Sequence, residues 1–172
     1  MKEILTIDQG TTSSRSIIFN ESLEMLRVSQ EDYDLMYPND GWVEADADKI
    51  LKSVQNTLND VLKHHKDISN IASCGITNQR ESTVIWDKLS GKAIYPVIIW
   101  QDRRTAALCN NLKEDQKLAE MVSKKTGLIL DPYFSATKIK WILDNVEGAR
   151  TKANAGELAF GTIDSFLIWN LT

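Results

Sequence analysis

The sequence has few of the residues on which several classes of protein depend. Only two cysteines, Cys74 and Cys109, and two histidines, His64 and His65, occur in 172 residues. Two cysteines in unrelated settings provide neither a disulfide framework nor a Cys/His metal site, which fits a reducing compartment. Both histidines lie at the frayed end of a predicted helix, so a Ser-His-Asp triad or a histidine-metal mechanism has no basis.

Long apolar runs and dense positive charge are also missing. No stretch approaches the roughly 18 apolar residues of a membrane span, and the first residues lead into a short strand, so we expect neither a signal peptide nor a membrane anchor. The formal net charge is −4 and no basic stripe occurs, which argues against a nucleic-acid or anionic-membrane partner. With 42% hydrophobic and 26% charged residues, the composition is typical of one globular domain, which we expect to be cytoplasmic.

The chain opens with a polar turn between two β-rich runs, residues 4–7 and 16–19. Between them lie one carboxylate, one glycine, four hydroxyl side chains and one arginine, namely Asp8, Gly10, Thr11, Thr12, Ser13, Ser14 and Arg15. Gly10 lets the backbone approach an anion, and the hydroxyl and backbone N–H groups add donors, so the turn is a candidate phosphate site. Asp8 beside a phosphate needs a cation, and Mg²⁺ prefers such oxygen ligands, directly or through water. The alternative is a polar hairpin in which Asp8 caps its own turn.

Hydrophobic periodicity predicts the other elements. A third strand over 24–33 makes an antiparallel meander with the first two. A helix is expected over 45–66, with Asp46 or Asp48 as its cap. Small and branched residues over 71–76 predict a central strand covered on both faces. Further strands are expected at 83–86 and 94–99, further helices at 105–112, 115–126 and 136–146, and a short helix or loop at 150–157. Residues 158–165 are expected to form a short strand that leads into a capped helix ending at residues 171–172.

Polar and aromatic side chains follow two of these strands. Arg80 and Glu81 come after the strand that begins at residue 71, and Trp100 follows the strand over 94–99. Ligands of open α/β sheets bind outside the carboxyl ends of strands. An adjacent cation and carboxylate suit the hydroxyls of a small polyol, although ion pairs with other residues are the alternative. Trp100 is either a flat wall for a carbon skeleton or plain core, and Tyr133 either presents its hydroxyl from a turn or is a half-buried surface tyrosine.

The first turn, Asp8-Gln9-Gly10-Thr11-Thr12-Ser13-Ser14-Arg15, resembles the first phosphate-binding motif of the FGGY carbohydrate kinases, a family within the actin-like ATPase superfamily. Residues 75–81, 99–105, 131–135 and 140–144 resemble further stretches of the family, in the family's order. A series that runs along the whole chain is far more specific than any single motif. The resemblance implies a ribonuclease-H-like α/β domain, whose mixed sheet has three antiparallel N-terminal strands and is flanked by helices.

The motifs are most similar to those of family members that transfer the γ-phosphoryl group of ATP to glycerol, and this implies individual roles. Gly10, Thr11, Thr12 and Ser13 would bind ATP phosphates, Arg15 would balance charge as ADP forms, and Asp8 would act on Mg²⁺. Arg80, Glu81 and Tyr133 would bind the glycerol hydroxyls, with Trp100 along the carbons. A kinase for another polyol is one alternative, and a non-catalytic actin-like nucleotide-binding or assembly module is the other.

One feature of the family is absent. Its catalytic base is an aspartate in a Gly-Asp-Gln motif, and this sequence contains no Gly-Asp-Gln. The resemblance therefore implies that residues 1–172 form an incomplete N-terminal kinase domain, without the adenosine-binding second domain and with no catalytic base of its own. We expect these residues alone to be inactive. The sequence sets no oligomeric state and is compatible with self-association of the complete protein.

Overall fold

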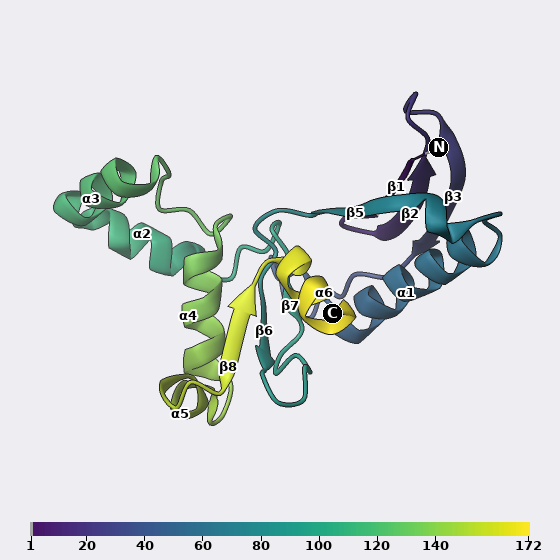
Figure 1. Ribbon diagram of the computed structural model, residues 1–172. Helices are drawn as coiled ribbons and strands as arrows, with labels where there is room; N and C mark the ends of the chain where they lie inside the picture. The colour runs from purple at the N-terminus through teal and green to yellow at the C-terminus, as the bar shows by residue number, and fades with distance from the viewer. Residues whose placement is uncertain (1) are drawn as a thin grey trace.

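A computed structural model describes residues 2–172 (Figure 1). Its strands are β1 (Glu3–Gln9), β2 (Ser13–Phe19), β3 (Met25–Asp32), β4 (Glu44–Ala45), β5 (Ile71–Asn78), β6 (Val84–Asp87), β7 (Val97–Ile98) and β8 (Leu158–Gly161). Its helices are α1 (Ala47–Lys63), α2 (Ala106–Glu114), α3 (Gln116–Thr126), α4 (Ser135–Asn145), α5 (Ala149–Asn154) and α6 (Ile163–Leu171), with a 3₁₀-helix at Ile68–Asn70. None of these helices is long and apolar enough to cross a membrane.

The main sheet has the strand order β3-β2-β1-β5. β1 pairs with β2, and β2 with β3, in antiparallel fashion, whereas β1 and β5 are parallel. The first three strands are joined by the short segments 10–12 and 20–24, and such connections can only link antiparallel neighbours. The parallel pair needs a crossover, which α1 provides. The predicted mixed sheet with three antiparallel N-terminal strands is therefore confirmed.

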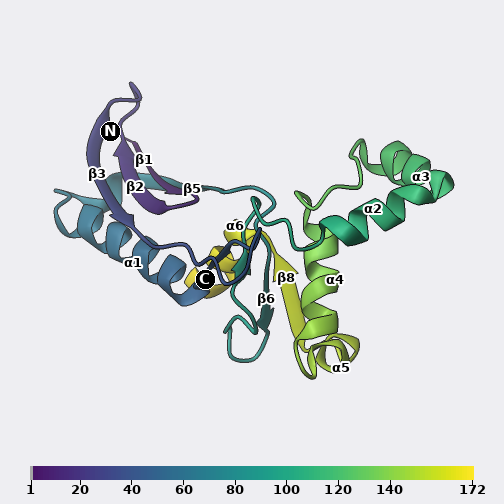
Figure 2. The same cartoon turned by 180° about the vertical axis from the view of Figure 1, so that it is seen from behind.

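One face of this sheet is covered by α1. Ile50, Val54 and Val61 recur at helical spacing, are fully or almost fully buried, and pack with Leu5 and Ile7 of β1. The alternation of β1 places these two residues on the covered face and the side chains between them on the other. Figure 2 shows α1 running along the sheet, with α6 beside β6.

The prediction of a central strand covered on both faces is wrong. β5 is the last strand in the order of the main sheet, and its residues 72–75 are exposed. Small and branched residues are typical of covered strands, but burial depends on neighbours that the local pattern does not specify. The strand expected over 94–99 is also shorter than predicted, since β7 comprises only Val97 and Ile98. Pro96 has no N–H to donate to a ladder.

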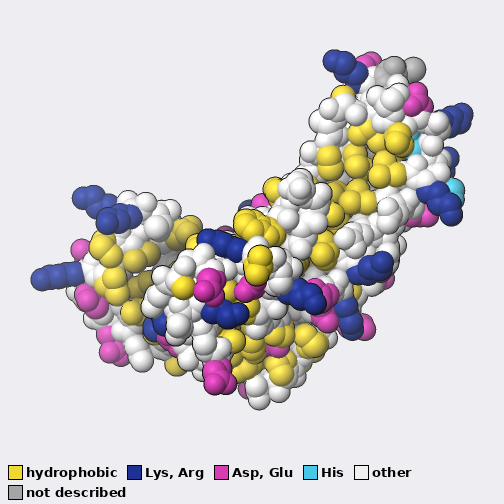
Figure 3. Space-filling model, turned by 60° about the horizontal axis from the view of Figure 1, so that its bottom comes forward, with side chains coloured by type: hydrophobic (Ala, Val, Ile, Leu, Met, Phe, Trp, Pro, Cys, Tyr) yellow, Lys and Arg dark blue, Asp and Glu magenta, His cyan; other side chains and the backbone are white. Residues whose placement is uncertain are grey.

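A second group of elements, which includes β6, β8, α4 and α6, packs against the main sheet and α1. β6 pairs with β8, and α4 lies beside β6, where Ile85, Ile98 and Ile142 form a buried cluster. Phe166 of α6 packs edge-on against Trp86 of β6, with the ring centroids 5.6 Å apart. In both ribbon views α2 and α3 extend away from the main sheet, with α4, β6 and β8 between them (Figures 1 and 2). On the face in Figure 3, lysines and arginines are interspersed with acidic residues.

Candidate functional site

An open cleft of about 310 Å³ lies where the main sheet meets the loops of the second group of elements. Its walls are formed by Asp8, Gln9, Gly10 and Thr11 at the end of β1, Asn78, Gln79 and Arg80 at the end of β5, Trp100 after β7, and Tyr133 before α4. Because β1 and β5 are parallel, their carboxyl ends meet at one edge of the sheet. Residues singled out from distant parts of the sequence therefore line one cleft.

The cleft walls do not include Thr12, Ser13, Arg15 or Glu81. Ser13 and Arg15 belong to β2, which begins earlier than expected, and Thr12 is exposed in the turn. Arg15 lies opposite Asp8 in the β1/β2 ladder, and its guanidinium donates to Oε1 of Gln30 from Nε at 3.0 Å and from Nη2 at 2.6 Å. The arginine thus borders the carboxylate from the neighbouring strand.

The peptide at Gly10 is held by three side-chain donors that meet at its carbonyl oxygen. The amide of Gln9 and the hydroxyl of Tyr33 each donate to this oxygen at 2.6 Å, and the amide of Gln79 donates at 3.1 Å. Burial raises the pKa of Tyr33 to about 12, so its hydroxyl stays protonated and remains a donor over the physiological range. The Gly10 N–H donates to the carbonyl of Ser13 at 2.8 Å, which closes the turn. Hydrogen bonds to its backbone therefore hold the candidate phosphate turn in one conformation.

The same network reaches Trp100, on the other wall of the cleft. Ser82 Oγ donates to Oε1 of Gln79 at 2.8 Å and accepts the backbone N–H of Trp100 at 3.0 Å. The indole N–H of Trp100 donates to the hydroxyl of Thr11 at 3.0 Å. The half-buried indole is thus anchored at one end to the phosphate turn, while its ring lines the cleft. This arrangement differs from that of a plain core tryptophan.

Arg80 and Glu81 lie in the loop between β5 and β6. Within residues 2–172 neither side chain forms an ion pair, so the alternative that they pair with other charged residues is not supported there. Arg80 is exposed and lines the cleft, whereas Glu81 is half-buried beside it. Glu81 has a φ of 65°, a left-handed conformation that is uncommon for a residue other than glycine. Its carboxylate Oε2 lies 3.4 Å from the hydroxyl of Ser135 at the start of α4.

Tyr133 completes the aromatic side of the cleft. Its ring meets that of Trp100 edge-on with the centroids 6.0 Å apart, and it packs against Phe134 at 5.1 Å in the same manner. Edge-to-face packing of this kind fixes the orientation of the rings in addition to burying them. Two aromatic walls therefore face a turn with hydroxyl and carboxylate groups, a setting that suits a small molecule with a carbon skeleton and several hydroxyls.

Comparison with known proteins identifies the family of this chain. Residues 3–172 match the N-terminal domain of the FGGY family of carbohydrate kinases. The chain belongs to this family. A glycerol kinase of Alteromonas mediterranea is 56% identical over 172 residues, covering 99% of this chain and 35% of that protein. A glycerol kinase of Marinomonas sp. is 55% identical over 170 residues, covering 98% of this chain and 34% of that protein. The chain thus spans about a third of the length of the curated relatives it matches.

Solved structures of FGGY proteins have the same fold. The crystal structure of Plasmodium falciparum glycerol kinase with ADP matches with a TM-score of 0.92 and 33% identity, covering 100% of this chain and 34% of that one. A gluconate kinase from Lactobacillus acidophilus matches with a TM-score of 0.82 and 20% identity, covering 98% of this chain and 32% of that one, which shows the fold alone. The predicted ribonuclease-H-like, actin-like ATPase class is confirmed.

Four residues received no role from the sequence, although they form the polar network that supports the cleft: Gln9 and Gln79 line it, and Tyr33 and Ser82 lie behind it. Gln9 and Gln79 stand in the motifs quoted above, and both are buried. For Gln9 a signal existed, because the alternation of Leu5 and Ile7 places it on the covered face, where a polar group needs partners. Tyr33 and Ser82 carry no local signal, since their partners are distant in sequence or set by a loop.

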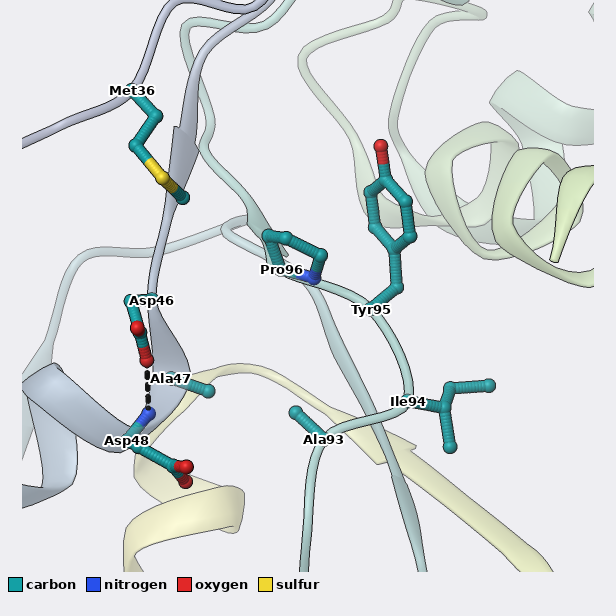
Figure 4. Close-up of a pocket in the computed structure, with 8 residues that line it drawn as sticks. All are labelled: Met36, Asp46, Ala47, Asp48, Ala93, Ile94, Tyr95 and Pro96. Atoms are coloured by element: carbon teal, nitrogen blue, oxygen red, sulfur yellow. Dashed lines mark hydrogen bonds between the residues drawn. The ribbon is translucent and has the colours of Figure 1, made fainter.

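A second hollow, of about 390 Å³, lies near the start of α1 and contains none of the predicted site residues. Figure 4 shows its lining, with the Asp46 carboxylate turned back toward the helix. That carboxylate accepts the backbone N–H groups of Asp48 at 2.8 Å and Lys49 at 3.2 Å, so Asp46 and not Asp48 caps α1. The hydroxyl of Tyr95 donates to Glu44. These polar groups already form hydrogen bonds within the protein, so we assign the candidate site to the cleft at β1 and β5.

Proposed function

We propose that this chain is the N-terminal domain of a glycerol kinase, which transfers the γ-phosphoryl group of ATP to glycerol and yields sn-glycerol 3-phosphate and ADP, the first step of glycerol catabolism. The observation that carries the proposal is the shared cleft, in which the hydroxyl-rich turn at Gly10 and Thr11 faces Arg80, Trp100 and Tyr133. The likeness to the Plasmodium kinase, solved with ADP, supports it. Phosphoryl transfer chiefly requires that the reacting groups are positioned and that negative charge is neutralised, and these residues can serve both purposes.

At the phosphate end, Gly10, Thr11, Thr12 and Ser13 bind the ATP phosphates. The Gly10 peptide is pinned through its carbonyl, so the turn keeps its shape when an anion binds. Arg15 borders the carboxylate of Asp8 from β2 and balances negative charge as ADP forms. The oxygen donors of Asp8 and of the turn hydroxyls fit Mg²⁺, and Asp8 forms no ion pair within the described residues that would compete. When bound, Mg²⁺ would neutralise charge on the phosphates.

At the glycerol end, Arg80, Glu81 and Tyr133 bind the hydroxyls, and the Trp100 ring lies along the carbons. Arg80 supplies donors only, the Glu81 carboxylate acceptors only, and the Tyr133 hydroxyl either, which together satisfy a polyol. The hydrogen bond from the Trp100 indole to the Thr11 hydroxyl joins the two ends at 3.0 Å. Holding both substrates against one rigid wall is how such a site supplies proximity and orientation.

We further propose that residues 1–172 are the first part of a two-domain enzyme in the cytoplasm, whose catalytic-base aspartate and adenosine-binding domain lie outside these residues. The absence of Gly-Asp-Gln from the sequence supports the first point. Cys74 and Cys109 are both free, which agrees with a reducing compartment.

We predict that the 172 residues alone do not phosphorylate glycerol at a measurable fraction of the rate of the complete protein, because they contain no Gly-Asp-Gln. The test is a coupled assay of glycerol 3-phosphate formation by both proteins, with circular dichroism to show that the shorter one is folded. Activity in the complete protein supports the proposed function. Turnover by the 172 residues at a comparable rate would refute the placement of the base, and a complete protein that binds nucleotide but phosphorylates no polyol would favour the assembly module.

The glycerol assignments predict a graded series of substitutions in the complete protein. Arg80→Ala and Glu81→Ala should each weaken glycerol use by about ten- to a hundredfold, because a hydrogen bond to a charged group contributes about 1.5–3 kcal/mol. Tyr133→Phe should have a smaller effect, since it removes one neutral hydroxyl and keeps the ring. Steady-state kinetics with glycerol and ATP varied in turn would measure KM for each substrate.

Arg27→Ala is the matched control, because this arginine is exposed on β3 and does not line the cleft. It should leave both KM values unchanged. A defect of folding would weaken ATP and glycerol use together, so only a loss confined to glycerol supports the assignment. Folded Arg80→Ala and Glu81→Ala proteins that use glycerol as well as the parent would show that the pair is structural.

A further inference from the structure

Lys138 is a fully buried lysine in α4, with 0% of its surface exposed. Lysine is rarely buried unless its ammonium is paired, yet Lys138 forms no ion pair among the residues described. Its Nζ instead donates to two backbone carbonyl oxygens, that of Glu81 at 3.2 Å and that of Tyr133. Both acceptors belong to residues of the proposed glycerol site.

The two carbonyls lie in segments that are far apart in the sequence. Glu81 is in the loop between β5 and β6, and Tyr133 is in the turn that precedes α4. One side chain therefore links the backbone of both segments, from a position one helical turn inside α4. The Lys138 ammonium thus bridges the Glu81 and Tyr133 backbones.

The backbone at Glu81 also needs such support. Its φ of 65° lies in the left-handed region, which costs a residue with a β-carbon energy unless surrounding contacts hold it. The carbonyl of this residue accepts from Lys138 Nζ and, at 3.2 Å, from the hydroxyl of Ser135. The first turn of α4 thus holds the strained peptide from which the Glu81 carboxylate extends.

We propose that Lys138 is a positioning residue of the glycerol site, which holds the strained loop of Glu81 at a fixed spacing from the turn of Tyr133. This inference rests on the proposed function and adds to it a residue that touches neither substrate. It accounts for a buried cation that packing alone does not require, because a methionine of similar length would fill the same space.

Burial opposes the charge on this side chain. It lowers the pKa of Lys138 from the ordinary 10.5 to about 8, although Asp102, Glu81, Asp131 and Cys109 act in the opposite direction. Replacing Lys138 by methionine would remove this unfavourable burial while taking one side-chain donor from the Tyr133 carbonyl and one from the Glu81 carbonyl. For the free energy of unfolding, removal of a buried charge and loss of hydrogen bonds oppose each other. For the glycerol site, both lost hydrogen bonds weaken the support of the Glu81 and Tyr133 backbones.

The test is Lys138→Met in the complete protein. We expect KM for glycerol to rise about tenfold or more, since two hydrogen bonds from a charged donor are lost, while KM for ATP and the unfolding temperature stay close to those of the parent. Lys140→Met is the control on the same helix. Lys140 is exposed and pairs with Asp144 at 2.6 Å, away from the cleft, so this variant should match the parent in all three measurements.

Ser135→Ala provides a second variant that keeps the lysine. It removes the neutral hydroxyl that contacts the Glu81 carbonyl at 3.2 Å and the Glu81 carboxylate at 3.4 Å, and it should raise KM for glycerol a few-fold, about the effect of one ordinary hydrogen bond. If Lys138→Met does not fold, this variant decides, and an unchanged KM for glycerol overturns the inference. A folded Lys138→Met protein with the parent's KM for glycerol also overturns it. A parent protein that does not phosphorylate glycerol refutes the proposed function first, and the inference with it.

Discussion

Asp8→Asn in the complete protein is expected to lower kcat for glycerol phosphorylation about 10²- to 10³-fold, the scale seen when one preorganised electrostatic contact to a transition state is removed. Asp8 lines the cleft at the carboxyl end of β1, beside the turn proposed to bind phosphates. Its interaction with a phosphate-bound cation matters most as charge moves, so KM for glycerol should change little. Initial-rate assays of glycerol 3-phosphate formation would measure kcat and KM for glycerol. Titration calorimetry would measure glycerol binding independently.

Two further measurements separate this role from a structural one. The affinity of the parent for ATP should depend on Mg²⁺, and that dependence should weaken in Asp8→Asn. Asp32→Asn is the control, because Asp32 is exposed at the end of β3 and does not line the cleft. If Asp8→Asn keeps its turnover and loses only thermal stability, Asp8 is a residue that caps its own turn, as the polar-hairpin interpretation holds.

The largest loss of stability is expected for Arg104→Met. The Arg104 side chain has no exposed surface, and its Nη2 lies 2.7 Å from Glu44 and 2.8 Å from Asp102. Its guanidinium also stacks on Trp42 at 3.9 Å and on Trp141 at 4.5 Å. Methionine would leave two buried carboxylates without their ion-pair partner, and breaking such a pair costs about 3–5 kcal/mol of the free energy of unfolding. Urea denaturation of the parent and the variant would measure the loss.

The neighbouring arginine is a natural control. Arg103 is 57% exposed and makes one longer contact, at 3.3 Å, with Asp131, so Arg103→Met should cost less than about 1 kcal/mol. Adding Glu44→Gln and Asp102→Asn to Arg104→Met removes the unpaired charges and should restore part of the stability. If Arg104→Met is as stable as Arg103→Met, the buried cluster contributes no net stability.

Much of the local structure followed from short-range patterns in the sequence. The β-rich runs at the start of the chain and the short turns between them predicted an antiparallel meander, and the three- and four-residue spacing of Ile50, Val54 and Val61 predicted α1. The helix end at Gly127 was also predictable, because the left-handed cap there, with a φ of 72°, suits glycine. These features depend on steric and hydrophobic preferences that act within a few residues.

The exposure of β5 and the short β7 were predicted wrongly for the complementary reason. The residues of β5 suit a covered strand, yet whether a strand is covered depends on which elements lie beside it. Likewise, the sequence placed Arg80, Trp100 and Tyr133 at the exits of strands or in turns, but it could not show that they share one cleft with Thr11. That required the parallel pairing of β1 and β5.

By itself, then, the sequence determined the family and the mixed, partly antiparallel sheet, and it showed which polar side chains the first turn contains, because each of these is given by contiguous motifs and periodic patterns. Only the tertiary structure decided that Tyr33 and Gln79 support the Gly10 carbonyl, that the Trp100 indole binds the Thr11 hydroxyl, and that Lys138 links two loops. The partners in these contacts are separated by many residues, and a buried polar group reveals its partner only when the chain has brought the two within hydrogen-bonding distance.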